Sequence, residues 1–184
     1  MMNIYETLKD IIKGHRIILI DGRCGSGKSS LGRKLKEEFD TSLIHTDDFY
    51  LPFILRDKDW KDKLAGHMDF KRLREEVIKP YEDNKTFTPM GYNAHEDCSF
   101  ELDEIDPLKP LIIEGSYSGY FKDDNYLIFV TCDKKTQEER LRKREGISFD
   151  NFRNIWIKKE EDFFEYYHIE EKADMKIYTG ENND

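Results

Sequence analysis

The sequence lacks an excess of basic residues and any long apolar run. It carries 39 acidic against 30 basic residues, for a formal net charge of −9. A general nucleic-acid-binding surface needs a basic face for the phosphate backbone, so this charge argues against nucleic acid as a partner. No apolar run approaches the roughly 20 residues that cross a membrane, so no membrane partner is expected.

Cysteine is scarce as well. The three cysteines, Cys24, Cys98 and Cys132, are odd in number and form no C-x-x-C. They are expected to be free thiols, as is usual in a reducing compartment. Residues 1–13 contain acidic side chains and no long apolar core, so no signal peptide is expected. We therefore expect a cytoplasmic protein.

What the sequence does contain is an alternation of two patterns over a length, 184 residues, that suits one domain (1–184). Short apolar segments rich in β-branched residues predict strands at 16–20, 41–46, 111–113, 126–130 and 173–178. Helical periodicity predicts helices at 3–13, 29–39, 69–81 and 134–145, and again after Gly146. Residues 84–106 lack clear periodicity and predict a loop or a small hairpin. The alternation is typical of a parallel α/β sheet with helices on both faces.

The most informative motif is the segment 22–29, which fits G-x-x-x-x-G-K-[ST] at every fixed position. An apolar strand precedes it and an amphipathic helix follows it, which is the context of a phosphate loop and argues against a chance glycine turn. Lys28 is expected to reach the β- and γ-phosphates, and the Ser29 hydroxyl to bind Mg²⁺. The expected nucleotide-binding residues are Gly22, Arg23, Cys24, Gly25, Ser26, Gly27, Lys28, Ser29 and Ser30.

Two acidic residues follow predicted strands. Asp47 comes after the second strand and Glu114 ends the third. Because ligands gather at the carboxyl ends of parallel strands, both should face the phosphate loop. Asp47 could accept the proton of a hydroxyl acceptor or help to hold Mg²⁺, and Glu114 could meet Mg²⁺. The alternatives are a turn or cap acid for Asp47 and a solvated strand-end acid for Glu114.

A basic helix supplies a candidate lid at about 140–150. Arg140 and Arg144 are four residues apart and share a helical face. Such arginines can stabilise the charge that phosphoryl transfer spreads over the equatorial oxygens, so both are candidate catalytic residues. The alternative is a solvated helix whose arginines pair with Glu138, Glu139 and Glu145.

Residues of a predicted acceptor-side insertion, about 50–108, could form the substrate pocket. The candidates are Tyr50, Arg56, Asp69 and Tyr92. Arg56 could hold the pocket shut or contact an anionic substrate. Each of the four also has a plain explanation in packing or surface exposure.

With these residues in place, the chain resembles the uridine kinase group of P-loop kinases, which includes phosphoribulokinase and pantothenate kinase. The matching segments are 20–29, Asp47-Asp48-Phe49-Tyr50 (the group's D-x-F-Y), 112–115 and the arginine-bearing helix 137–146. The chain is also similar to short bacterial uridine kinase-like proteins at 48–52, at 114–118 and at a late Trp-Ile. The resemblance spans nearly the whole chain, about 17–177.

The resemblance implies a three-layer P-loop NTPase fold with a five-stranded parallel sheet, helices on both faces and a helical lid. It implies ATP as phosphoryl donor and Mg²⁺ as metal. By position, Asp47 takes the role of the acceptor-side carboxylate, Glu114 that of the metal-side acid, and Tyr50 a role in the nucleoside pocket.

One segment departs from the group. Its nucleoside pocket usually contains Tyr-Asp-Phe followed shortly by His, whereas here Asn93 and Ala94 follow Tyr92, and His95 comes earlier. The acceptor therefore stays open. The first hypothesis is an ATP-dependent small-molecule kinase that phosphorylates a hydroxyl, foremost the 5′-hydroxyl of a pyrimidine nucleoside. The alternatives are a nucleoside monophosphate kinase and a non-catalytic nucleotide-binding regulator. The partner is then a small-molecule substrate, and the sequence leaves open whether the chain forms a homo-oligomer.

Overall fold

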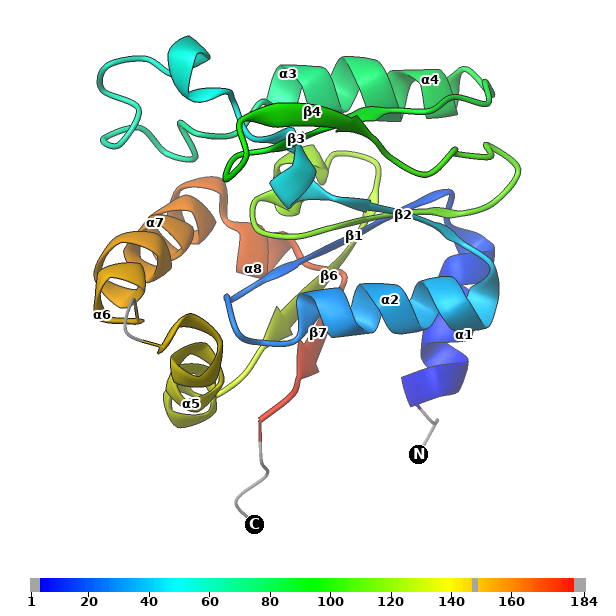
Figure 1. Ribbon diagram of the computed structural model, residues 1–184. Coiled ribbons are helices and arrows are strands. Elements are labelled where there is room, and N and C mark those ends of the chain that lie inside the picture. Colours follow the sequence, from blue (N-terminus) through cyan, green and yellow to red (C-terminus); the bar gives the residue numbers. More distant parts are fainter. Residues whose placement is uncertain (1–3, 147–148, 181–184) are drawn as a thin grey trace.

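The computed structural model describes residues 4–146 and 149–180, and the apolar segments of these residues form one five-stranded parallel sheet (Figure 1). The strands are β1 (Ile17–Gly22), β2 (Ser42–His45), β5 (Leu111–Glu114), β6 (Tyr126–Thr131) and β7 (Met175–Tyr178), in the order β2-β5-β1-β6-β7. Every residue of the central strand β1 is buried, because a parallel sheet is covered on both faces. The predicted five-stranded parallel sheet is confirmed.

Helices cover both faces, also as predicted. The helices are α1 (Ile4–Gly14), α2 (Lys28–Phe39), α3 (Phe70–Leu73), α4 (Lys79–Glu82), α5 (Lys134–Glu145), α6 (Phe149–Phe152), α7 (Lys158–Tyr167) and α8 (Ile169–Lys172). Alternate side chains of a strand point to opposite faces. Ile18 and Ile20 therefore pack in one core with α1 and α2, whereas Leu19 packs in a second core with α3, α4, α7 and α8.

The predicted helix 69–81 is a continuous helical run from α3 to α4 that contains a π-helical turn, Arg74–Ile78. It ends at Glu82, two residues beyond Pro80. Proline lacks an N–H and is tolerated only where no intrahelical donor is needed. The wide turn before α4 places Pro80 in the first turn of α4, so the chain stays helical past it.

The segment 84–106 contains a hairpin, one of the two structures predicted for it. Strands β3 (Met90–Asn93) and β4 (Cys98–Glu101) pair antiparallel and lie beside α3 and α4 in Figure 1. A loop that precedes α3 carries the short 3₁₀ turn Phe53–Leu55. No helix among the described residues is long and apolar enough to span a membrane.

The packing of both faces of the sheet predicts which side chains stabilise the fold. Leu19 is fully buried in the central strand, so Leu19→Ala removes packed apolar volume and leaves a cavity. We expect the free energy of unfolding, measured by urea denaturation, to fall by about 2–5 kcal/mol. Ile54→Ala is the control, because Ile54 is 91% exposed, and it should change stability by less than about 0.5 kcal/mol. Equal effects of the two substitutions would contradict this packing.

Candidate active site

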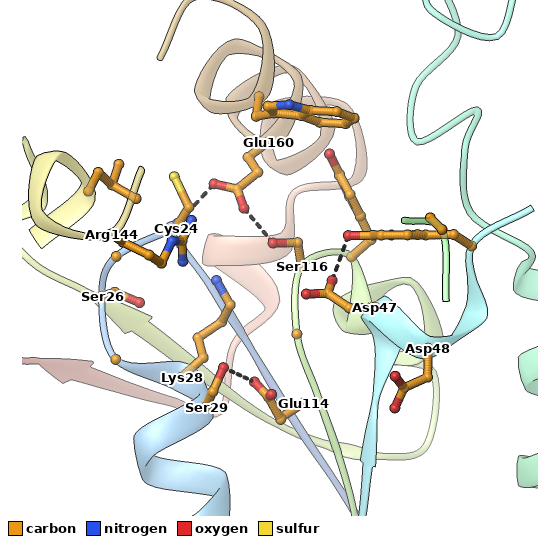
Figure 2. A pocket seen from close by; sticks show the side chains of 18 of the residues that line it. Cys24, Ser26, Lys28, Ser29, Asp47, Asp48, Glu114, Ser116, Arg144 and Glu160 are labelled. Atoms are coloured by element: carbon orange, nitrogen blue, oxygen red, sulfur yellow. Dashed lines mark hydrogen bonds between the residues drawn. The ribbon is translucent and has the colours of Figure 1, made fainter. Parts of the chain in front are cut away.

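A cleft of about 1440 Å³ opens at the carboxyl ends of β1, β2 and β5. Ligand sites form here in open parallel sheets because the connecting loops diverge from the strand ends. The described residues that line it include, besides most of the phosphate loop, Asp47, Asp48, Tyr50, Arg56, Tyr92, Glu114, Arg140 and Arg144. Figure 2 shows Lys28, Glu114 and Asp47 facing this cleft.

The phosphate loop is shaped by its glycines. Gly22 has φ of 136°, and a Cβ there would lie 1.9 Å from the Val130 carbonyl oxygen, so only glycine fits. Gly27, with φ of 100°, leads into α2 at Lys28. The backbone N–H groups at the start of this helix have no intrahelical partner, which makes its N-terminus suited to an anion.

Two side chains of the loop have unused hydrogen-bonding capacity. The buried Lys28 ammonium donates one hydrogen bond, 2.6 Å from Nζ to the Gly22 carbonyl oxygen. The Ser26 hydroxyl is buried and has no hydrogen-bond partner. An ammonium has three donors, and buried polar atoms are rarely left unpaired. Both groups therefore fit a loop that binds a phosphate.

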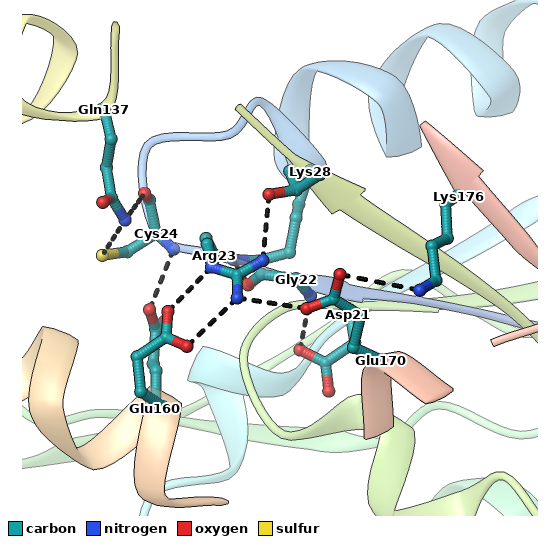
Figure 3. A network of polar contacts seen from close by, with 11 residues as sticks. Asp21, Gly22, Arg23, Cys24, Lys28, Gln137, Glu160, Glu170 and Lys176 are labelled. Carbon is teal, nitrogen blue, oxygen red and sulfur yellow. Dashed lines mark hydrogen bonds and ion pairs between the residues drawn. The ribbon is translucent and has the colours of Figure 1, made fainter. Parts of the chain in front are cut away.

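A buried carboxylate supports the loop from beneath (Figure 3). Asp21 is fully buried and accepts the backbone N–H groups of Gly22 (2.7 Å), Gly119 (2.8 Å) and Tyr117 (3.3 Å). Burial raises the pKa of Asp21 to about 7, and the nearby Lys28 ammonium opposes this rise. Asp21 thus joins the end of β1 to the turn that follows β5.

The sequence predicts that Arg23 binds the nucleotide, but its side chain binds other residues of the protein. Its guanidinium binds Glu161 at 2.8 and 3.1 Å, Thr131 Oγ1 at 3.0 Å and Glu170 at 3.1 Å. Burial opposes its charge, but these carboxylates raise the pKa of Arg23 overall. Neither Gly22 nor Arg23 lines the cleft, whereas the other expected loop residues, 24–30, do.

Glu160 is a cleft residue that the sequence analysis did not identify. It lies on α7, is buried, and accepts the Cys24 backbone N–H at 2.9 Å and the Ser116 hydroxyl (Figure 2). It follows Trp156 by four residues on a largely aromatic helical stretch. The sequence did contain a signal for it, an acid on an otherwise apolar helical face. Such a face is buried, and a buried carboxylate requires hydrogen-bond partners, so the acid indicates a polar site.

Glu114 and Ser29, both predicted to bind Mg²⁺, are in hydrogen-bond contact. The Ser29 hydroxyl donates to Glu114 Oε2 at 3.3 Å, and His45 Nδ1 donates to Glu114 Oε1. Glu114 is buried, and its hydrogen bond raises the pKa of His45. No cluster of three or more metal-ligating side chains occurs in the described part of the chain. Mg²⁺ in phosphotransferases needs only one or two carboxylates besides the phosphates, so the pair fits that ion.

Asp47 lies on the 3₁₀ turn Thr46–Phe49, directly after β2. Its carboxylate is exposed to the cleft and accepts the Tyr50 hydroxyl at 2.7 Å. Burial, and then the adjacent Asp47 charge, raise the pKa of Tyr50 well above its usual value. Burial also raises the pKa of Asp48. Asp47 therefore presents an accessible carboxylate opposite the phosphate loop.

The remaining predicted substrate residues differ in position. Arg56 lines the cleft, but its Nε donates to the Leu51 carbonyl oxygen at 2.7 Å and its guanidinium lies 4.0 Å from the centre of the Phe53 ring. Tyr92 also lines the cleft, and its hydroxyl donates to Asp97. Asp69 does not line it.

Asp69 is instead the N-cap of α3 and accepts the Arg72 backbone N–H at 3.0 Å. An acid at this position satisfies one of the free N–H groups of the first turn.

The two arginines of the predicted lid lie at the rim of the cleft. Arg140 donates to the carbonyl oxygens of Gly25 (3.2 Å) and Ser26 (3.4 Å), and to that of Thr179 (2.7 Å). It thus joins α5 to the phosphate loop and to the segment after β7. Arg144 lines the cleft and donates to Glu145 at 2.5 Å. Residues 147–148 of the predicted lid, 140–150, lie outside the described residues.

Aromatic and polar residues distant in sequence complete the cleft. Those that the sequence analysis did not identify include Phe53, His67, Phe100, Ser116, Tyr117, Trp156, Glu160 and Thr179. Long-range packing brings most of them to the cleft. The exceptions are Ser116 and Tyr117, which follow Glu114 at the end of β5, and Glu160, an acid on an apolar helical face.

The fold is shared with solved structures of a kinase and of proteins provisionally assigned as kinases. A possible uridine kinase from Bacillus stearothermophilus has a TM-score of 0.64 and 16% identity, covering 93% of this chain and 99% of that one. A protein provisionally assigned as a fructose transport system kinase, from Silicibacter sp. TM1040, has a TM-score of 0.65 and 17% identity. The match covers 96% of this chain and 100% of that one. D-glycerate 3-kinase from Cryptococcus neoformans has a TM-score of 0.62 and 12% identity, and the match covers 96% of this chain and 95% of that one. At these identities the likeness shows the P-loop kinase fold.

Sequence comparison gives the family. No curated protein matches the sequence. The model of the AAA domain family matches residues 18–155, a span that includes the phosphate loop, Asp47, Glu114 and the helix of Arg140. Since this span is most of the chain, the protein belongs to the AAA domain family and has the fold of a P-loop kinase.

Proposed function

We propose that this protein is an ATP-dependent kinase that transfers the γ-phosphate to a hydroxyl group, with the 5′-hydroxyl of uridine or cytidine as acceptor. The observation that carries the proposal is the placement of Asp47. Its accessible carboxylate, with Tyr50 bound to it, lines the same cleft as the phosphate loop and Lys28.

On the donor side, the loop residues bind and orient phosphates. When bound, ATP supplies the transferable phosphoryl group and Mg²⁺ screens its negative charge. The Lys28 ammonium and the backbone N–H groups of the loop would bind the phosphates, and the Ser26 hydroxyl, which has no partner in this structure, would add a donor. Ser29 and Glu114 would hold Mg²⁺, and Arg140 and Arg144 stand at the rim as candidates for charge stabilisation.

On the acceptor side, Asp47 orients the hydroxyl and takes its proton. A sugar hydroxyl is neutral and a poor nucleophile, so a carboxylate within hydrogen-bond reach accelerates its attack by roughly 10²–10⁴-fold. Tyr50 keeps the carboxylate in place through its 2.7 Å hydrogen bond.

The main rival, a nucleoside monophosphate kinase, needs cations where its anionic acceptor binds. Arg56 lies at the cleft but already contacts Leu51 and Phe53. Arg72 binds Glu76 at 3.0 Å and does not line the cleft. Arg33 and Lys34 also line the cleft, but they belong to α2, the helix that follows the phosphate loop. The acceptor side around Asp47 therefore favours a neutral substrate. A carboxylate there also favours an enzyme over a nucleotide-binding regulator, which has no need of one.

The acceptor itself is tested by replacing Asp47. We expect ADP release with uridine or cytidine and little with UMP or CMP. Asp47→Asn should lower turnover of the nucleoside by about 10²–10⁴-fold, since an amide cannot take the proton. Asp83→Asn, an exposed surface control outside the cleft, should be neutral. Faster turnover of UMP or CMP, unaffected by Asp47→Asn, would instead establish the monophosphate kinase.

The phosphate site is tested at Lys28. Lys28→Ala removes a positive charge from the phosphate loop and should lower the kcat of the folded protein by roughly 10²–10³-fold. Lys36→Ala is the matched control, because Lys36 lies on the same helix and pairs with the exposed Asp103. Near-normal turnover of Lys28→Ala would rule out this phosphate site.

The metal position is tested at Glu114. Glu114→Gln keeps the shape and removes the charge, so the Mg²⁺ concentration for half-maximal rate should rise about tenfold or more. Binding of nucleotide without metal should change little. Glu101→Gln, on the exposed β4, is the control. An unchanged Mg²⁺ midpoint and maximal rate in Glu114→Gln would leave Glu114 a structural acid.

A further inference from the structure

Two buried polar atoms without partners belong to residues of the cleft. The described residues contain four such side-chain atoms: Ser26 Oγ, Thr41 Oγ1, His67 Nδ1 and Ser118 Oγ. Of these four residues, Ser26 and His67 line the cleft. Ser26 belongs to the phosphate loop and is explained by a bound nucleotide. His67 has no role in the chemistry proposed above, yet it costs free energy to bury an unpaired ring nitrogen.

His67 lies inside an aromatic box, defined as Tyr50, Trp60, Tyr117 and Trp156. The ring centroids of these residues lie 5.2, 6.1, 5.4 and 5.0 Å from that of His67. His67 is 2% exposed, and three parts of the chain contribute the surrounding rings: the loop 50–60, the turn after β5 and the turn before α7. Tyr50 is also bonded to Asp47, so the box adjoins the proposed acceptor carboxylate.

The imidazole is neutral in this setting. Burial, and then the positive charges of Arg56 and Lys159, lower the pKa of His67 to about 3. A neutral imidazole offers one donor and one acceptor nitrogen. Flat rings around a neutral hydrogen-bonding group suit an uncharged planar ring with polar edge atoms, and they disfavour phosphates and carboxylates.

We infer that His67 is the specificity-determining residue for the acceptor, and that it hydrogen-bonds the base of a nucleoside held against the aromatic box. This inference rests on the proposed function, because it names the residue that recognises the base of the proposed nucleoside substrate. Tyr92 is less suited to the task, because its hydroxyl is already bonded to Asp97. Nδ1 is covered in this structure, so the neighbouring rings must shift when the base enters.

The two tryptophans give a readout that needs no catalysis. The sequence contains only Trp60 and Trp156, and both belong to the aromatic box. Intrinsic fluorescence of the full chain, titrated with uridine, cytidine and D-ribose without nucleotide, therefore reports on this site. We expect a saturable response to uridine or cytidine and none to D-ribose.

Three variants separate recognition from structure. His67→Phe removes a side chain that makes no hydrogen bond through Nδ1 and keeps an aromatic ring, so the melting temperature should stay level or rise. The Kd of the nucleoside should rise about tenfold, as expected for one lost hydrogen bond. His67→Gln restores a donor and an acceptor and should bind more tightly than His67→Phe. His15→Phe, outside the cleft, is the control and should leave Kd unchanged.

Several results would overturn the inference: no response of the wild type to either nucleoside, an equal response to D-ribose, an unchanged Kd in His67→Phe, or no gain from His67→Gln over His67→Phe. Failure of the kinase proposal can be distinguished from failure of this inference about His67. Nucleoside binding that depends on His67, without phosphoryl transfer, supports the inference and contradicts the kinase. Transfer to uridine that is independent of His67 does the reverse.

Discussion

The buried carboxylate of Asp21 holds the phosphate loop in its wrapped form. It accepts N–H groups from Gly22, at the start of the loop, and from Tyr117 and Gly119, which follow β5. One residue therefore fixes the distance between the donor loop and the strand end that carries Glu114. Its burial is costly, and the three hydrogen bonds together with the nearby Lys28 charge offset that cost.

Helix α7 and the turn before it contact both ends of the cleft. Glu160 binds the Cys24 N–H in the phosphate loop, and Glu161 binds Arg23. One turn earlier, Trp156 packs against His67 in the aromatic box. A shift of this helix would thus move the donor loop and the acceptor pocket together. The arrangement explains why an acid is retained within a largely aromatic stretch.

Features with local causes could be predicted from the sequence. The phosphate loop, its strand and its helix follow from glycine spacing and apolar periodicity, and the rule on strand ends places Asp47 and Glu114 at the cleft. The predicted substrate role of Asp69 is different. An acid directly before a helix is also typical of an N-cap, and in the structure Asp69 is the N-cap of α3. His67 depends on packing between segments about 90 residues apart, as in the His67–Trp156 contact, which no single-sequence pattern contains. Glu160 stands out as an acid on an apolar helical face, but its partners Cys24 and Ser116 are distant in sequence.

The central claim is that a hydroxyl acceptor meets the γ-phosphate in this cleft. Phosphorus NMR of the protein with ATP, Mg²⁺ and uridine tests it most directly, because each phosphorus is observed by its chemical environment. The account predicts that the γ-phosphate signal is replaced, in equal amount, by that of a phosphate monoester. Conversion of ATP to ADP and inorganic phosphate alone, or no conversion with either uridine or cytidine, would contradict it.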